Sequence, residues 1–312
     1  DLPAMLGEGP QRPADLSRYD IEMLAEINHT PRLSDAEILR IARHYAHTRK
    51  QFGVPIEKLP AVAELVTDMR VAVEAARALV YETSTVCDLE NNNLRVLEMY
   101  PSLDPDEAKR RKAESRNHKR LNGMLTPMSK YYASELCIRI ANDAIQVLGG
   151  SGYMTDYPAE RYLRDARITT IYEGTSQLQI VAAVRGVCSG AFEKRVEELE
   201  QRTFTDELLI RLQTDLGEAK KLVLQAIKFV KERGNEYMDL HGRKLVDSAV
   251  TVLVGHLLLK QAAVSDRKKA VARRFIDTGL PTLRRDVELI CSGDQTPIEQ
   301  FDLIAGPPGS AS

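Results

Sequence analysis

Apolar residues recur at three- and four-residue spacing through most of this sequence, and the period-two alternation typical of β-strands is nearly absent. One such face follows Pro60 and would lie along a single side of a long helix: Val62, Leu65, Val66, Met69, Val73 and Ala76. A second face runs from Leu208 to Val230 and ends at Gly234. Residues 246–259 are apolar on nearly every side, as in a helix buried inside a bundle. The sequence therefore predicts an all-α fold.

Capping residues predict where several helices begin. Ser34 and Glu37 form a capping box, and the helix that follows is expected to run to Gln51. Asp104 is a favourable N-cap, since its carboxylate can accept a hydrogen bond from a backbone N–H of the first turn. Pro105 after it occupies the first helical position, where proline is tolerated.

Two glycines mark the end of a further long helix, which we expect from Met124 to Leu148. Between Ser151 and Thr175 the pattern breaks into turns and short pieces. A helix resumes after Thr175 and is expected to continue towards Glu200.

These elements predict four regions. Residues 1–33 contain four prolines and two glycines and are expected to be an irregular lead-in with one short helix near Tyr19–Ile27. Residues 34–200 are expected to form a four-helix-bundle-like domain, and residues 201–305 a second helical domain. Residues 306–312 are expected to be a flexible tail.

The charge balance argues against nucleic acid and anionic membranes as partners, since 43 Lys and Arg stand against 45 Asp and Glu. The four cysteines are widely spaced and no His-rich segment accompanies them, so no metal site is expected. The stretch 246–259 is shorter than the roughly 20 apolar residues that a membrane span needs. With no visible signal peptide, we expect a cytoplasmic protein.

Three short motifs could carry chemistry: QVLGGSGY from Gln146 to Tyr153, RDAR from Arg164 to Arg167, and IYEGTSQ from Ile171 to Gln177. Taken singly, each has an ordinary structural explanation. Paired glycines cap helices, arginines beside an aspartate form salt bridges, and a glutamate at a helix start interacts favourably with the helix dipole.

Together and in this order, the motifs resemble the C-terminal signature of acyl-CoA dehydrogenases, in which Leu-Gly-Gly-x-Gly-Tyr precedes Arg-Asp-x-Arg and then Ile-Tyr-Glu-Gly-Thr. The upstream segment YAHTRKQFG, from Tyr45 to Gly53, is similar to the same family's Tyr-Ala-x-x-Arg-x-Gln-Phe-Gly helix end. The resemblance covers roughly residues 36–190. Leu59–Val62 and the helical extension at 205–305 are similar to the branch of the family that carries an extra helical domain.

The resemblance implies roles for five neighbouring residues. Glu173 matches the catalytic base, which removes the α-proton of an acyl thioester while a hydride leaves Cβ for the flavin, and its backbone N–H would help bind the thioester carbonyl. Tyr172 and Gly174 match substrate-contacting positions. Thr175 and Gln177 match groups that hold FAD, whose pyrophosphate would lie at the helix N-terminus.

Other matched positions lie further from the base. Arg49, Gln51 and Phe52 match residues that reach the FAD of a neighbouring subunit. Arg185 matches a position that touches the coenzyme A moiety, although a solvent-facing helix arginine explains it equally well. Three residues match the binding site for the adenosine end of FAD: Gln146, Gly149 and Gly150.

The implied activity is FAD-dependent dehydrogenation of an acyl-CoA in fatty acid β-oxidation, with electrons passing to an electron-transfer flavoprotein and with a homo- or hetero-oligomeric assembly. Family members place an N-terminal helical domain and a β-domain before this region, and only about 35 residues precede it here. The chain is therefore expected to be a fragment of a longer protein, to be completed by a partner chain, or to have lost catalysis. The alternative function is a non-catalytic helical subunit that completes the flavin site of a partner chain. A third, nucleic-acid-binding relative is disfavoured because the net charge is near zero.

Overall fold

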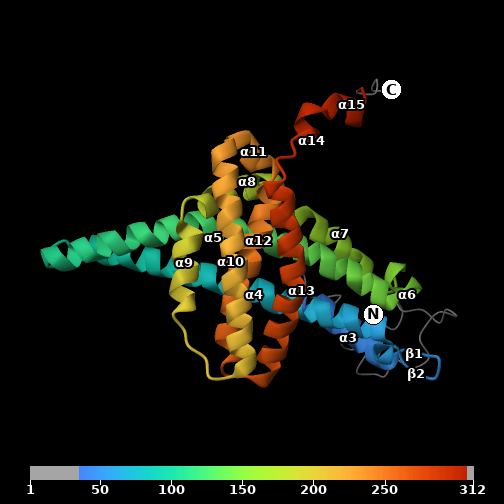
Figure 1. The fold of residues 1–312 in the computed structure, drawn as a ribbon. Coiled ribbons are helices and arrows are strands. Elements are labelled where there is room, and N and C mark those ends of the chain that lie inside the picture. The colour runs from blue at the N-terminus through green and yellow to red at the C-terminus, as the bar shows by residue number, and fades with distance from the viewer. Residues whose placement is uncertain (1–34, 308–312) are drawn as a thin grey trace. The chain divides into compact units, whose positions relative to one another are not determined.

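A computed structural model describes residues 35–307 of the protein, and within them the predicted all-α fold is confirmed (Figure 1). The lead-in, its short helix near Tyr19–Ile27, the Ser34 cap and most of the tail lie outside the described residues. The long elements are α3 (Asp35–Thr48), α4 (Pro60–Met99), α5 (Pro105–Leu148), α10 (Glu207–Arg233), α12 (Gly242–Ala262) and α13 (Asp266–Cys291). The shorter ones are β1 (Lys50–Gln51), β2 (Val54–Pro55), η1 (Ile56–Lys58), α6 (Gly150–Tyr153), α7 (Ala159–Thr169), α8 (Ser176–Cys188), α9 (Ala191–Glu200), α11 (Asn235–Leu240), α14 (Thr296–Glu299) and α15 (Phe301–Ala305).

The described chain packs into two units, and each contains segments that are distant in sequence. Unit 1 comprises residues 35–80 and 129–176, and unit 2 comprises residues 81–128 and 177–307. The long helices α4 and α5 contribute to both. The predicted domain boundary near residue 200 stays a prediction.

The core of unit 1 is built by α3 with parts of α4, α5 and α7. Its fully buried side chains include Ile38 and Leu39 of α3, Met69 of α4 and Ile140 of α5. The face predicted after Pro60 is confirmed, because its six residues are all buried in this core or packed against it.

The first helix ends earlier than predicted. It stops at Thr48, and the expected extension to Gln51 is wrong because Lys50 pairs with Pro55 in a two-stranded antiparallel hairpin. Phe52 and Gly53 form its turn with φ angles of 53° and 81°. Two consecutive residues with positive φ are typical of the tight turn that matches the twist of a hairpin. Gly53 accommodates this geometry at no steric cost. The hairpin turn therefore ends the helix before Gln51, although the helical pattern of the sequence continues to that residue.

The predicted cap of α5 is confirmed, since the Asp104 carboxylate accepts hydrogen bonds from the backbone N–H groups of Asp106 and Glu107 at 3.0 and 3.1 Å. The helix then continues without interruption to Leu148, so the expected separate helix from Met124 is wrong. Pro127 lies inside α5. Met124, Leu125 and Met128 around it are fully buried, and this packing offsets the hydrogen bond that the proline ring removes.

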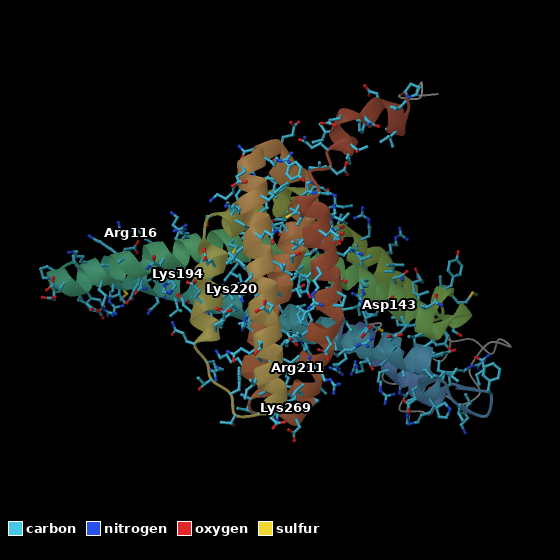
Figure 2. The ribbon with its side chains drawn as sticks, viewed as in Figure 1. Arg116, Asp143, Lys194, Arg211, Lys220 and Lys269 are labelled. Carbon is cyan, nitrogen blue, oxygen red and sulfur yellow. The ribbon has the colours of Figure 1, made fainter. Side chains whose placement is uncertain are left out.

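Unit 2 contains a bundle in which α12 packs against α9, α10 and α13 (Figure 1). The predicted helix towards Glu200 is divided into α8 and α9 at Gly190, whose φ is 89°. The predicted stripe of α10 ends at Gly234 as expected, but Leu209 rather than Leu208 occupies its first buried position. An ion pair joins α10 to α13, between Arg211, which is labelled in Figure 2, and Asp277 at 3.0 Å.

Helix α12 is buried over most of its surface, which confirms the prediction for residues 246–259. Within the described part of the chain it is the one helix long and apolar enough to cross a membrane. Its apolar side chains face the other helices of the bundle, and this packing accounts for its composition.

Candidate active site

The residue that matches the catalytic base lies in a tight turn of unit 1 between α7 and α8. The backbone N–H of Tyr172 donates to Ile168 O at 3.1 Å, and the N–H of Ser176 donates to Thr170 O at 3.0 Å, so both ends of the turn are hydrogen-bonded. Glu173 has a φ of 52°, a left-handed conformation that is uncommon for a residue other than glycine. Such strain persists where the surrounding structure imposes it, and it is concentrated at functional sites.

Glycine after the base permits the turn to close. Gly174 has a φ of 91°, beyond the range that L side chains adopt easily. Glu173 and Tyr172 are both exposed at the surface of the chain, with Tyr172 49% accessible. Both residues are therefore accessible from solvent in this chain.

A lysine that the sequence analysis did not single out binds this turn from α5. Lys130 Nζ donates hydrogen bonds to Thr169 O at 2.8 Å and to Gly174 O at 2.9 Å. The same ammonium lies 5.6 Å from the centre of the Tyr172 ring, within cation–π range. A sequence offers little warning of such a role, because the two acceptors are main-chain carbonyls.

The start of α8 follows the turn directly. Ser176 Oγ donates to the Glu135 carboxylate of α5, which fixes the first residue of the helix. The first turn of α8 contains no acidic residue. The positive end of the helix dipole at this start favours an anion. The half-buried Thr175 and the exposed Gln177, the two residues assigned to FAD, flank this helix start.

A second set of predicted residues lies at the other end of unit 1. Arg49, directly before β1, is exposed, as are Gln51 and Phe52 of the β1–β2 hairpin, and Phe52 is 84% accessible at the tip of the hairpin. Gly149 has φ 59° and ψ −138°, a combination open essentially to glycine alone. Gln146 and Gly150, beside it, are exposed.

The end of α3 and the glycine loop are neighbours. Tyr45 Oη donates to Ser151 Oγ at 3.3 Å, and the Tyr45 and Tyr157 rings meet edge to face with centroids 6.1 Å apart. The structure therefore brings the end of α3, which leads into the hairpin, close to the loop that contains Gly149. Glu173 follows the opposite end of α7, whose eleven residues span about 16 Å at 1.5 Å per residue. The predicted residues of unit 1 thus form two groups rather than one cluster.

Arg185, the predicted coenzyme A contact, is engaged within unit 2. Its guanidinium contacts Asp239 at 2.8 Å and donates to Met238 Sδ at 2.7 Å, which joins α8 to α11. The side chain is 38% accessible, so one edge faces solvent. The assignment to coenzyme A stays a prediction.

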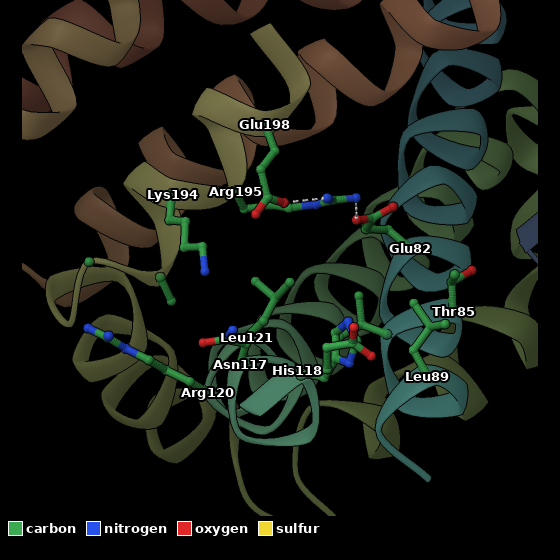
Figure 3. A pocket seen from close by; sticks show the side chains of 14 residues that line it. Glu82, Thr85, Leu89, Asn117, His118, Arg120, Leu121, Lys194, Arg195 and Glu198 are labelled. Carbon is green, nitrogen blue, oxygen red and sulfur yellow. Dashed lines mark hydrogen bonds and ion pairs between the residues drawn. The ribbon is translucent and has the colours of Figure 1, made fainter. Parts of the chain in front are cut away.

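A pocket in unit 2 is lined by none of the predicted site residues (Figure 3). It has a volume of about 250 Å³ and lies among α4, α5 and α9. Arg195 crosses one wall, bound to Glu82 and, at 2.8 Å, to Glu198. Lys194 points into the pocket toward Leu121 and Asn117. Because carboxylates and cations line it in similar number, the charges select no particular ligand.

Two family descriptions match the chain. Residues 35–100 and 108–188 match "Acyl-CoA dehydrogenase, C-terminal domain", and residues 188–290 match "Acyl-CoA dehydrogenase C terminal". The chain belongs to the acyl-CoA dehydrogenase family. The two matches together extend from the start of α3 to residue 290 in α13.

Individual relatives agree with this membership. The probable acyl-CoA dehydrogenase FadE25 of Mycobacterium tuberculosis is 33% identical over 171 residues, covering 53% of this chain and 37% of the relative. Subunit CarC of the caffeyl-CoA reductase–Etf complex of Acetobacterium woodii is 38% identical over 135 residues, covering 43% and 28%. An acyl-CoA dehydrogenase from Bacillus anthracis, solved with FAD, has a TM-score of 0.61 at 21% identity, covering 88% and 47%.

This last similarity shows a shared fold. The chain spans less than half the length of each of these relatives.

Proposed function

We propose that this chain takes part in the FAD-dependent α,β-dehydrogenation of an acyl-CoA thioester, with Glu173 as the base. The observation that carries the proposal is the turn itself. A glutamate is held in a left-handed conformation, exposed, directly before the N-terminus of α8. Since this geometry strains the backbone, a purely structural turn would be served better by glycine or asparagine. Retention of glutamate is expected where its carboxylate performs chemistry.

The proposed reaction begins with proton transfer to this carboxylate. Glu173 accepts the proton from Cα of the thioester, and the electron pair of that C–H bond forms the new double bond as a hydride leaves Cβ. FAD, when bound, supplies the acceptor for that hydride. The backbone N–H of Glu173 would donate to the thioester carbonyl and stabilise the negative charge that develops there. The exposed Tyr172 and Gly174 flank the base and would contact the acyl chain.

The residues proposed to hold FAD fit its chemistry. The first turn of α8, which contains no acidic residue, offers backbone and side-chain donors to a pyrophosphate together with Thr175 and Gln177. In the other group, the exposed Arg49 and Gln51 offer a guanidinium and an amide, and Phe52 an aromatic face. The Gly149 backbone bears no side chain, and a Cβ added there or at Gly150 would meet open space, so the backbone is accessible to a large ligand.

The separation of the two groups supports an assembly of more than one subunit. Phe52 projects from its hairpin with almost no contact to its own chain, as expected of a residue that reaches the FAD of a neighbouring subunit. For the electron acceptor we propose an electron-transfer flavoprotein. The name of the relative CarC, a subunit of an Etf complex, supports this partner class.

The test is spectroscopic. The protein, purified with any chain that completes its flavin site, is expected to absorb near 450 nm (about the position of oxidised flavin) and to bleach when a short acyl-CoA is added anaerobically. Glu173→Gln should keep the flavin and bleach about 10²–10⁴-fold more slowly, since the variant loses its general base. Glu160→Gln, which removes a carboxylate of α7 in the same unit, should bleach normally. A Glu173→Gln protein that bleaches as fast as the wild type contradicts the catalytic assignment and favours the non-catalytic subunit.

A further inference from the structure

Lys130 bridges the two ends of the turn that contains the proposed base. Its acceptors are the carbonyl of Thr169, at the end of α7, and the carbonyl of Gly174, directly after Glu173. The two hydrogen bonds are 2.8 and 2.9 Å long, in the range of charge-assisted bonds. One ammonium group on the continuous helix α5 therefore fixes the main chain on both sides of the base.

A cation is well suited to this position. The last carbonyls of a helix have no intrahelical partners and carry the negative end of the helix dipole, so a lysine at the end of α7 is favourable on both grounds. Gly174 lies in a turn, so its carbonyl oxygen does not take part in the regular hydrogen bonding of a helix or a sheet. A neutral side chain of the same length would leave both carbonyls without this donor. The strained backbone at Glu173 would then lose the contact that opposes its relaxation.

Lys130 also contacts the aromatic ring of Tyr172. Its ring lies 5.6 Å from Lys130 Nζ, so the ammonium also contacts the residue directly before the base. On the other side, Glu135 of α5 binds Ser176, one residue after Thr175. Two side chains little more than one helical turn apart on α5 thus secure the segment from Thr169 to Ser176.

We propose that Lys130 is a positioning residue, which holds Glu173 in the geometry required for proton abstraction. This inference rests on the proposed function of Glu173. Lys130 contacts neither substrate nor cofactor in the proposed reaction, and it acts through the backbone of the turn. A displacement of a reacting group by about 1 Å can reduce a rate on the order of 10²-fold, which sets the expected size of the effect.

The first measurement needs no activity. Hydrogen exchange followed by mass spectrometry reports on the amides of Tyr172 and Ser176, which are hydrogen-bonded across the turn. Lys130→Met keeps the length and apolar stem of the side chain but removes the donor, and exchange in the 168–178 segment should accelerate about tenfold or more. Lys130→Arg retains a cationic donor and should restore protection in part.

The matched control is Lys220→Met in unit 2. Lys220 is also largely buried, with 13% of its side chain accessible, and it binds Glu200 at 2.8 Å. Its loss should lower stability without changing exchange in the 168–178 segment. Unchanged exchange in Lys130→Met, or equal acceleration in Lys220→Met, overturns the positioning role.

The second measurement is turnover in the flavin-loaded protein. Lys130→Met should lower kcat about 30- to 100-fold with KM changed less than about threefold, and Lys130→Arg should recover part of the loss. A Lys130→Met variant with accelerated exchange and unaltered kcat overturns the inference while leaving Glu173 as the base. If Glu173→Gln retains full turnover, the proposed function fails, and the exchange data still decide whether Lys130 secures the turn.

Discussion

The bundle of α10, α12 and α13 and the turn from Thr170 to Thr175 are stabilised in opposite ways. In the bundle, continuous helices bury apolar side chains such as Leu216, Leu253 and Ile276 almost completely. In the turn, the residues from Ile171 to Glu173 are exposed, and a few hydrogen bonds to main-chain carbonyls hold a strained backbone. Stability in the bundle comes from buried area, whereas the turn depends on a small number of polar contacts.

This difference between the bundle and the turn predicts which amino-acid substitutions each region tolerates. A packed helix is robust to surface substitution but loses several kcal/mol when a large core side chain is removed. A strained turn contributes little to global stability, yet a small displacement alters the position of its carboxylate. We therefore expect core substitutions to act mainly on the free energy of unfolding and turn substitutions mainly on catalysis.

The largest effect on stability is expected at the centre of α12. Leu253 is fully buried, and Leu253→Ala should lower the free energy of unfolding by about 2–5 kcal/mol, because the substitution removes apolar contacts and leaves a cavity. Urea unfolding followed by circular dichroism measures the change. Leu303→Ala, at a side chain that is 81% accessible, is the control and should change stability by less than about 0.5 kcal/mol. Equal effects at both positions would contradict the assignment of α12 to the core.

A smaller, pH-dependent effect is expected from the single buried histidine of α12. Burial lowers the pKa of His256 from 6.5 to about 4; the Glu200 carboxylate opposes this shift, and Lys220 reinforces it. Because the folded protein keeps His256 neutral while the unfolded chain binds a proton, stability is fully present above pH 6.5 and is lost as the pH falls towards 4.

The loss should be about 2 kcal/mol between pH 7 and pH 4.5, given 1.36 kcal/mol for each unit of pKa difference. His256→Gln cannot titrate and should lose correspondingly less over this interval, whatever its stability at pH 8. Urea unfolding at several pH values gives both curves. Parallel curves for the two proteins would show that His256 does not contribute to the acid sensitivity.

The sequence predicted the bundle better than it predicted the turn, and the reason is physical. Helical periodicity is a local signal repeated over many residues. The buried faces predicted after Pro60 and in α12 are therefore confirmed. The end of α3 was predicted wrongly because a two-residue hairpin turn at Phe52 and Gly53 dominates the helical pattern before it. The break expected before Met124 is absent because burial on both sides of Pro127 sustains α5.

Within the candidate site, the family motif predicted Glu173 as the base, a role that stays a prediction, and nothing in the sequence indicated its left-handed backbone. Lys130 could not be predicted because its partners, Thr169 and Gly174, lie 39 and 44 residues away and contribute carbonyl groups that every residue possesses. The sequence pattern also did not predict the hydrogen bonds of Arg185 to α11. Interactions with the main chain at long sequence separation therefore require the structure.

The smallest effect expected on stability is a gain, and it isolates the strain at the proposed base. Asparagine adopts the left-handed conformation more readily than glutamate, so Glu173→Asn should relieve part of the cost of the φ of 52°. Its free energy of unfolding should exceed that of Glu173→Gln by about 0.5–1 kcal/mol, within the range for a strained residue. Comparison with Gln is needed because both variants lose the favourable interaction of a carboxylate with the start of α8. Equal stabilities for the two variants would mean that the turn tolerates glutamate without strain; a more stable Asn variant would mean that the protein retains Glu173 at the expense of its own stability.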